Sequence, residues 1–172
     1  KGHATSALYP IFKDFKILKK KDWDNWGKNN NTCLRVFGNT SIPGVQVTTG
    51  SLGHGLGVAA GLATSNIKDK KNQNIYVIVS EGELYEGSTW ETLLYIAHYN
   101  LKSIKIIIDV NNLIILGKTN VCLKLNPIEK KIKGFGFSTK SINGHNFNEL
   151  NKSCKKLTNG SLQCLIINTV KG

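Results

Sequence analysis

The sequence predicts an α/β fold, a doubly wound and mostly parallel sheet flanked by helices, as a single domain over residues 1–172. Two apolar runs rich in β-branched residues, 75–79 and 105–109, are separated by a stretch with helical spacing, 88–99. This order is typical of a βαβ unit, whose two strands lie parallel. A further apolar run at 162–170 follows another helical stretch, and the alternation of strand and helix favours a doubly wound sheet.

Residues 4–15 have apolar positions at helical spacing, so we expect a helix there despite Pro10. The stretch 19–31 is rich in lysine and asparagine and predicts a surface connection or a short helix. Trp23 and Trp26 lie three residues apart within it. We expect these two rings to dock the polar segment on the body of the protein.

Glycine shapes the next two features of the sequence. The Pro-Gly pair at 43–44 predicts a turn, and 50–64 predicts a turn followed by a helix of small residues. Glycine and alanine in that helix would let a neighbouring backbone approach closely.

The part after the βαβ unit continues the alternation. Residues 137–142 predict a short strand, and the Asn-Gly pairs at 143–144 and 159–160 predict turns. The N-x-x-E spacing that begins at Asn146 is similar to a capping box, so we expect a helix over 147–157.

Composition narrows the classes of protein. A chain of 172 residues can bury a substantial core. No run of eighteen apolar residues exists to predict a transmembrane helix, and no basic, apolar leader indicates secretion. We expect a cytoplasmic protein with reduced thiols, because CxxC spacing is absent among the four cysteines, which are Cys33, Cys122, Cys154 and Cys164.

The formal charge of +12 raises the hypothesis of a nucleic-acid binder. Nearly all of the positive charge is lysine, and Arg35 is the single arginine in the sequence. Nucleic-acid readers use arginine forks and stacked aromatic rings. We therefore expect neither nucleic acid nor a membrane among the partners. A positive field would still favour an anionic cofactor and phosphorylated substrates.

Oxygen ligands follow both strands of the predicted βαβ unit. Glu81 and the small Gly82 come after the first strand, and Asn111 comes after the second. Ligands bind outside the carboxyl ends of the strands in open α/β sheets. Carboxylate and amide oxygens are hard donors that suit a divalent cation holding a diphosphate. The sequence therefore predicts a cation and diphosphate site at this edge of the sheet.

Several blocks in order resemble the diphosphate-binding domain of transketolase. E-G-E-L-Y-E-G-S-T-W-E at 81–91, followed by I-I-D-V-N-N-L at 107–113, is similar to the family's G-D-G…N-N motif in wording and spacing. P-G-V-Q-V-T-T-G-S-L-G-H-G at 43–55 resembles a second family signature, and K-G-H-A at 1–4 resembles the G-H-A block. The resemblance covers most of the chain and implies the thiamine diphosphate-binding fold.

The resemblance also implies the cofactors, thiamine diphosphate and Mg²⁺. The implied metal ligands are the Glu81 carboxylate, the Asn111 side-chain oxygen and the Leu113 backbone carbonyl. Taken alone, Glu81 would be interpreted as an exposed loop acid, but the surrounding motif favours the metal role. The residues that the resemblance places around the cofactor are His3, Gly50, Ser51, Leu52, Gly82, Glu83, Asn111 and Ile115.

Catalytic roles in the family correspond to His3 and Glu86. His3 would approach the diphosphate and the substrate channel, and Glu86 would lie at a subunit interface and support the partner's activating carboxylate. The alternative for Glu86 is a charge that complements the amino end of helix 88–99. His54 is either a site histidine or a polar residue at a helix start. His145 is expected to be structural, at a strand-to-helix turn.

This sequence departs from the family pattern at three positions. The family's metal-binding aspartate is Glu81 here, and the glycine before it is Ser80. The extra methylene of Glu81 should disturb the short, near-ideal distances that Mg²⁺ demands. Phe37 stands where the family has a substrate-contacting histidine, and an apolar ring cannot hydrogen-bond a sugar hydroxyl.

The implied activity is transfer of a two-carbon ketol unit between sugar phosphates, with a modified sugar acceptor left open by Phe37. The family's pyrimidine-activating glutamate belongs to a different domain. Activity would therefore need a separate pyrimidine-binding subunit, in a two-plus-two hetero-oligomer. Deoxyxylulose-phosphate synthase uses the same cofactor, but its sequence after the metal-binding acid differs from the E-L-Y-E-G-S-T-W-E found here. The resemblance therefore favours transketolase.

A degenerate, non-catalytic structural subunit with a weakened metal site is the alternative. The substitutions at Glu81, Ser80 and Phe37 are the observations that favour it. Both ends of the sequence fall within family motifs, so we expect a fragment or a shortened gene product, truncated at both ends.

Overall fold

The computed structural model describes residues 1–29, 34–157 and 160–171. The chain divides into two compact units, Lys1–Leu52 and Gly53–Gly172. Cys33 and Asn159, at which a thiol and a turn were predicted, lie outside the described residues.

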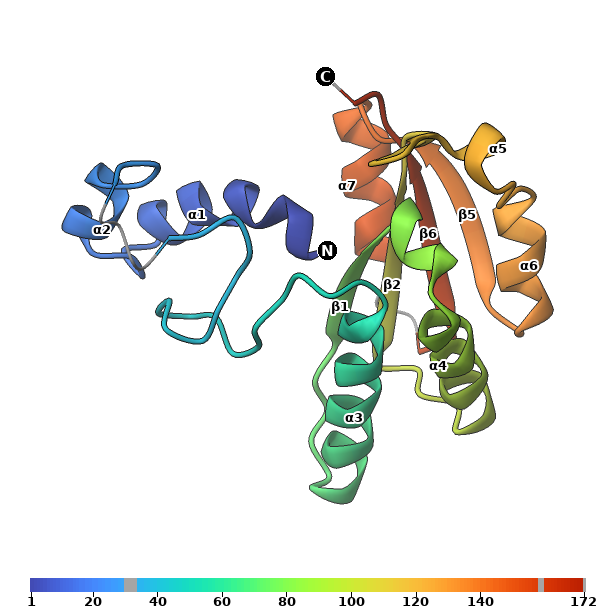
Figure 1. Cartoon of the computed structure of the whole chain (residues 1–172). Helices are drawn as coiled ribbons and strands as arrows, with labels where there is room; N and C mark the ends of the chain where they lie inside the picture. The colour runs from blue at the N-terminus through green and yellow to red at the C-terminus, as the bar shows by residue number, and fades with distance from the viewer. Residues whose placement is uncertain (30–33, 158–159, 172) are drawn as a thin grey trace. The chain divides into compact units, whose positions relative to one another are not determined.

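A four-stranded parallel sheet is the centre of the second unit (Figure 1). Its strands are β1 (Ile75–Ser80), β2 (Ile104–Val110), β5 (Ser138–Asn143) and β6 (Gln163–Asn168). They lie in the order β1-β2-β6-β5, and every neighbouring pair is parallel. The predicted α/β class with a parallel sheet is therefore confirmed, and β1 and β2 lie where β-branched residues are concentrated.

Helices cover both faces of this sheet. Figure 1 shows α3 (His54–Lys68), α4 (Gly87–His98) and α6 (Ile128–Gly134) on one face and α7 (Phe147–Lys156) on the other. The strand order explains the division. The chain advances across the sheet from β1 to β2 to β5 and then steps back to β6, so a right-handed crossover places the last helix on the opposite face.

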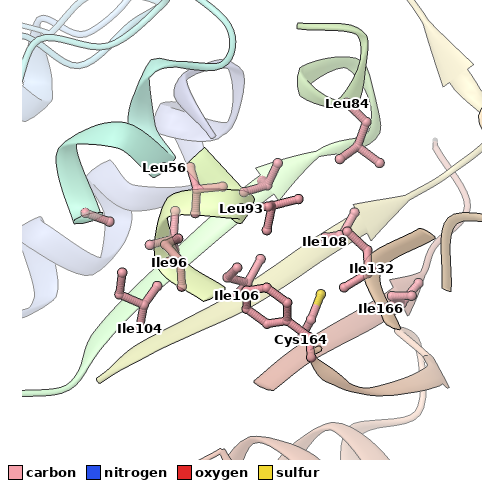
Figure 2. Close-up of a cluster of buried hydrophobic side chains, with 14 of the residues drawn as sticks. Leu56, Leu84, Leu93, Ile96, Ile104, Ile106, Ile108, Ile132, Cys164 and Ile166 are labelled. Carbon is pink, nitrogen blue, oxygen red and sulfur yellow. The ribbon is translucent and has the colours of Figure 1, made fainter. Parts of the chain in front are cut away.

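The two hydrophobic cores of this unit follow the alternation of side chains along the strands. Ile106 and Ile108 of β2 point into the larger core with Leu93 and Ile96 of α4 (Figure 2). The next residue, Ile107, packs instead into the smaller core against α7. Burying one such side chain stabilises the fold by roughly 1.5–3 kcal/mol, so the two cores hold helices against both faces of the sheet.

Several short elements of this unit were not predicted. They are η2 (Glu81–Tyr85), the β3–β4 hairpin (Leu113–Ile114 with Gly117–Lys118) and α5 (Thr119–Cys122). Each has five residues or fewer, which is too short for hydrophobic periodicity to reveal. The polar helix α6 was missed as well, although its buried Ile128 and Ile132 lie four residues apart.

The predicted start of α7 is only half a capping box. The Asn146 side chain accepts the Glu149 backbone N–H at 3.1 Å, as expected. The Glu149 carboxylate accepts the backbone N–H of Asn143 at 3.3 Å. The acid thus joins the helix to the end of β5.

The first unit contains η1 (Gly2–Ala4), α1 (Thr5–Asp14) and α2 (Lys20–Asp24). The helix predicted over 4–15 is confirmed, and the polar stretch after it forms the short helix α2.

Tyr9 is fully buried in the small core of this unit, and its hydroxyl donates to the Arg35 carbonyl at 2.5 Å. The Trp26 ring meets the Tyr9 ring edge-on at 5.6 Å, and it lies tilted against the Trp23 ring at 5.5 Å. The two tryptophans therefore pack their segment against α1 within this unit. In the described part of the chain, no helix combines the length and apolar character needed to cross a membrane.

Candidate functional site

The loop after β1 begins with a complete capping box. The Ser80 hydroxyl receives the Glu83 backbone N–H, and the Glu83 carboxylate accepts the Ser80 backbone N–H at 2.8 Å and its hydroxyl at 3.0 Å. Sequence reasoning missed this box, although S-x-x-E is its signature. The Glu83 carboxylate, buried at this position, has a local partner, and its predicted cofactor role stays a prediction.

The same loop is fastened to the first turns of α4. Thr89 donates its hydroxyl to the Glu83 carbonyl at 2.6 Å, and the Trp90 indole N–H donates to the Leu84 carbonyl at 2.9 Å. Thr89 is buried, so its hydrogen bond is shielded from water. The T-W pair of the family-like block thus fixes the loop that carries Glu81.

Glu81 joins the loops that follow β1 and β2. Its Oε2 accepts the backbone N–H groups of Asn111 at 3.1 Å and Asn112 at 2.7 Å. The residue is 2 % exposed, so its carboxylate lies inside the protein. Glu81 is therefore a buried connection between two strand ends and not an exposed loop acid.

The other carboxylate oxygen of Glu81 fits a cation. Among the described residues, Oε1 of Glu81 is one of two buried side-chain oxygens that have no hydrogen-bond partner. A buried charged oxygen without a partner is costly, and a hard divalent cation would supply the missing interaction. The residues present thus fit a metal ion at this position.

Asn111 and Leu113, two residues apart after β2, are the other predicted metal ligands. The Asn111 side-chain oxygen accepts the Leu113 backbone N–H at 3.0 Å, which closes a tight turn and leaves a second lone pair on that oxygen. Asn112 between them has φ of +61°, a conformation that asparagine tolerates better than most residues. Over the described residues, no group of three His, Cys, Asp or Glu side chains is placed to hold a metal. A site here would combine one carboxylate with an amide and a carbonyl.

Glu86 lies where the amino ends of α3 and α4 meet. It is the N-cap residue of α4 but makes no side-chain capping bond there. Gly53 caps α3 with φ of +77°, and a Cβ added to it would lie 2.6 Å from the Cβ of Glu86 and 2.5 Å from Oγ of Ser88. Only glycine fits this approach. The helix-end interpretation of Glu86 agrees with its place, and the interface role stays a prediction.

Ile115 is at the tip of the β3–β4 hairpin and is 94 % exposed. The hydroxyl of Tyr85 in η2 donates to the carbonyl of Leu123, the residue that follows α5, at 2.7 Å. This bond holds the segment after α5 to η2. Desolvation by burial raises the pKa of Tyr85, and the nearby charges of Cys122 and Glu81 raise it further. Tyr85 thus remains a neutral donor, and Ile115 presents a free apolar surface.

The first unit gathers a second group of predicted residues. The rings of His3 and Phe37 meet edge-on at 4.8 Å. Gly50 has φ of +134°, and a Cβ there would lie 3.2 Å from the Phe37 ring. A Cβ on Gly2 would lie 2.8 Å from the Gly50 nitrogen. The G-H-A block and the P-G-V…G-S-L block are therefore adjacent, as their shared assignment to one site requires.

The predicted site residues thus form two groups. The second unit places Glu81, Gly82, Glu83 and Asn111 at the carboxyl edge of its sheet, and the first unit places His3 and Phe37 beside the 50–52 turn. Ser51 is exposed and Leu52 is partly exposed in this turn, and His54 is exposed as the first residue of α3.

Comparisons with known proteins all indicate the same family. The sequence model described as "Transketolase, thiamine diphosphate binding domain" matches residues 2–171. One subunit of the apulose-4-phosphate transketolase from Actinobacillus succinogenes is 40% identical over 100% of this chain. The 6-deoxy-6-sulfo-D-fructose transketolase subunit SqwG from a Clostridium species is 34% identical, again over the whole chain. The chain spans 63% of the length of each of these relatives.

Solved structures share the fold. The transketolase of Leishmania mexicana superposes with a TM-score of 0.85 over 98% of this chain and 27% of that protein, at 24% sequence identity. The Campylobacter jejuni transketolase gives a TM-score of 0.79 over 87% of this chain and 24% of that protein, at 25% identity.

Proposed function

This chain belongs to the transketolase thiamine diphosphate-binding domain family, and from that premise we propose that it is the diphosphate-binding subunit of a split transketolase. The proposed reaction transfers a two-carbon ketol unit between sugar phosphates. In this proposal residues 1–172 act as one diphosphate-binding domain, and thiamine diphosphate with Mg²⁺ is the cofactor. Relatives whose names describe one subunit of a transketolase support the split arrangement.

The proposal rests on how the two oxygens of the Glu81 carboxylate are hydrogen-bonded. One of its oxygens holds the Asn111 and Asn112 amides, and the other is buried without a partner. A purely structural acid would have both oxygens satisfied by the protein. The unpartnered oxygen, together with the Asn111 amide oxygen, would hold the Mg²⁺ ion, and the Leu113 carbonyl would complete the protein's ligands.

The residues around this metal would hold and orient the cofactor. Gly82 would donate its backbone N–H to the diphosphate, near the amino end of α4, whose dipole favours negative charge. Ile115 would pack on the thiazolium ring, and the Gly50–Leu52 turn of the first unit would also face the cofactor. When bound, thiamine diphosphate supplies the electron sink for breaking and forming the carbon–carbon bond.

His3 and Phe37 carry the proposal for the substrate. His3 would approach the diphosphate and the substrate, where its ring can exchange a proton or donate a hydrogen bond. Phe37 beside it cannot hydrogen-bond a hydroxyl group. We therefore propose an acceptor that is modified relative to the common sugar phosphates. The relatives named for apulose-4-phosphate and for a sulfo-sugar fit this proposal.

A separate pyrimidine-binding subunit completes the proposed enzyme. Glu86 would lie at the interface with that partner and support its activating carboxylate. We propose a two-plus-two hetero-oligomer of the two kinds of subunit. We also propose that the enzyme acts in the cytoplasm, with neither nucleic acid nor a membrane as a partner.

Calorimetry with the partner subunit present tests the proposal. Thiamine diphosphate with Mg²⁺ should bind with measurable heat, and Asn111→Ala should weaken binding by about tenfold or more, since loss of even an outer-shell partner has that effect and Asn111 is proposed as a direct ligand. Asn72→Ala, at an exposed position before β1, is the matched control and should bind like the parent. No heat at millimolar cofactor would reject the proposal.

The rival function is a non-catalytic subunit that keeps only the fold and an interface. The Glu81 hydrogen bonds favour it, because they brace the two loops without any metal. This rival predicts that the chain binds the partner subunit while the cofactor produces no heat. The same titration therefore separates the two functions.

A further inference from the structure

The segment after β6 is attached to the end of β2. The Thr169 backbone N–H donates to the Val110 carbonyl at 2.8 Å, and its hydroxyl donates to Oδ1 of Asp109 at 2.6 Å. These bonds extend the β2–β6 pairing beyond the last register pair, Val110 with Asn168. Val110 is the residue directly before Asn111. Thr169 therefore fixes the backbone from which the proposed cofactor loop begins.

His145 holds this segment from the other side. The Nε2 atom of its imidazole accepts the Val170 backbone N–H at 2.8 Å. The turn that carries His145 is closely packed, since a Cβ on Gly144 would lie 2.4 Å from Cγ2 of Ile167 and 2.6 Å from Cγ2 of Thr169. The imidazole thus provides a polar contact that fastens residues 169–170 to the β5–α7 turn.

We propose that His145 is a positioning residue for the cofactor loop. Through Val170 and Thr169, its neutral imidazole holds the end of β2 in the place where Asn111 meets Glu81. The inference rests on the proposed function only in assigning Asn111 to the cofactor. The hydrogen bonds that connect His145 to Val110, through Val170 and Thr169, do not depend on that assignment.

The chemistry of the bond makes it sensitive to protons. Nε2 accepts a hydrogen bond only while it carries no proton, and histidine side chains change charge between about pH 5 and pH 8. Three charged residues are adjacent, by contact or in sequence, to the segments that His145 connects. They are Glu149 of α7, which binds the Asn143 backbone, Asp109 of β2, which binds Thr169, and Lys171, which follows Val170. Protonation of His145 would turn its acceptor into a donor and release Val170.

Amide hydrogen exchange on the whole chain tests the proposal without any cofactor. Between about pH 8 and pH 5.5, exchange at Val170 and Thr169, corrected for intrinsic rates, should become roughly tenfold less protected, as expected for the loss of one hydrogen bond. The Asn111 amide signal should shift along the same titration curve as the His145 ring protons. If Val170 follows His145 but Thr169 and Asn111 do not respond, the positioning role is wrong.

Two variants separate positioning from simple stability. His145→Gln keeps an acceptor at a similar distance but cannot be protonated in this range, so its protection should not change with pH. His98→Gln, in the last turn of α4, is the matched control and should titrate like the parent. A pH response in His145→Gln equal to that of the parent would overturn the proposal. The parent titration decides the question even if that variant fails to fold.

Cofactor affinity gives a second measurement with the partner subunit present. The parent should lose about tenfold in affinity for thiamine diphosphate with Mg²⁺ relative to His145→Gln on acidification over that range. Comparing variants removes the titration of the diphosphate itself. Equal losses in both proteins would overturn the inference. Absence of binding at every pH would reject the proposed function, and the exchange measurement would still decide the role of His145.

Discussion

Oε2 of Glu81 lies 2.7 Å from the backbone nitrogen of Asn112, and this contact joins the loops after β1 and β2. The family pattern has an aspartate at this position. The extra methylene of glutamate gives the carboxylate a longer reach, which it uses to accept two backbone N–H groups while Oε1 stays buried and unpartnered. One side chain thus braces the two loops and keeps one buried oxygen without a hydrogen-bond partner.

Glu81→Asp should separate these two tasks. The shorter side chain loses the bonds to Asn111 and Asn112, so the free energy of unfolding without metal should fall by about 1–3 kcal/mol. The affinity for Mg²⁺ with thiamine diphosphate should rise, because aspartate meets the short distances of Mg²⁺ more easily. Chemical denaturation and calorimetry measure the two effects. Glu91→Asp, exposed on α4, is the control and should change neither. Unchanged cofactor affinity in Glu81→Asp would count against the metal role.

Local patterns were sufficient to predict most of the second unit. The strands at 75–80, 104–110 and 163–168 contain uninterrupted apolar runs at 75–79, 106–108 and 164–167, and such runs are typical of buried parallel strands. The position of β6 between β2 and β5 was not predictable, because the order of strands depends on contacts between residues far apart in the sequence.

Gly53→Ala should be strongly destabilising. Alanine would be strained at φ of +77°, and its Cβ would overlap Oγ of Ser88 and the Cβ of Glu86. A loss of about 2–4 kcal/mol in the free energy of unfolding is expected from the strain and the overlap together.

Gly61→Ala is the matched control for this substitution. Gly61 lies within α3, and a Cβ added there meets no atom within 4 Å. Alanine should therefore stabilise the helix by roughly 0.5–1 kcal/mol. Denaturant unfolding of both variants measures the difference, and equal effects would contradict the close approach of α3 and α4 at Gly53.

Thr89→Val should loosen the loop that carries Glu81. Valine has a similar shape but cannot donate to the Glu83 carbonyl, which is buried with it. The free energy of unfolding should fall by about 1–2 kcal/mol, because a buried acceptor is left without this partner. Thr92→Val removes a hydroxyl that bonds only within α4, at the Ser88 carbonyl, and should cost less. A larger loss in Thr92→Val than in Thr89→Val would contradict the anchoring of η2.

Sequence patterns predicted which candidate site residues lie together but not their hydrogen-bond partners. The family-like blocks predicted that Glu81 and Asn111 share an edge of the sheet, and the structure places them in hydrogen-bond contact. The direction of the Glu81 carboxylate was not predictable, because it depends on backbone N–H groups whose orientation follows from the turn at Asn112. The contacts of His145 and Thr169 were missed for the same reason, since each joins segments that are distant in the sequence.

Lys105→Met should stabilise the protein, most strongly at neutral pH. Lys105 is 1 % exposed, its ammonium donates to the Lys102 carbonyl at 2.8 Å, and desolvation by burial lowers its pKa. At neutral pH both the folded and the unfolded chain carry the proton, so the folded state bears the full cost of burying the charge. A gain on the order of 1 kcal/mol is expected from an apolar side chain of similar length.

The pH dependence gives the sharper test of this buried charge. In the alkaline range between the lowered pKa and the ordinary one, the unfolded chain binds more protons than the folded chain, so the stability of the parent rises with pH. The advantage of Lys105→Met should therefore shrink as the pH approaches the ordinary lysine pKa. Lys102→Met, which alters an exposed lysine, should show neither the gain nor its pH dependence. Denaturant unfolding at several pH values measures this, and a constant advantage across the alkaline range would show that packing and not charge burial is responsible.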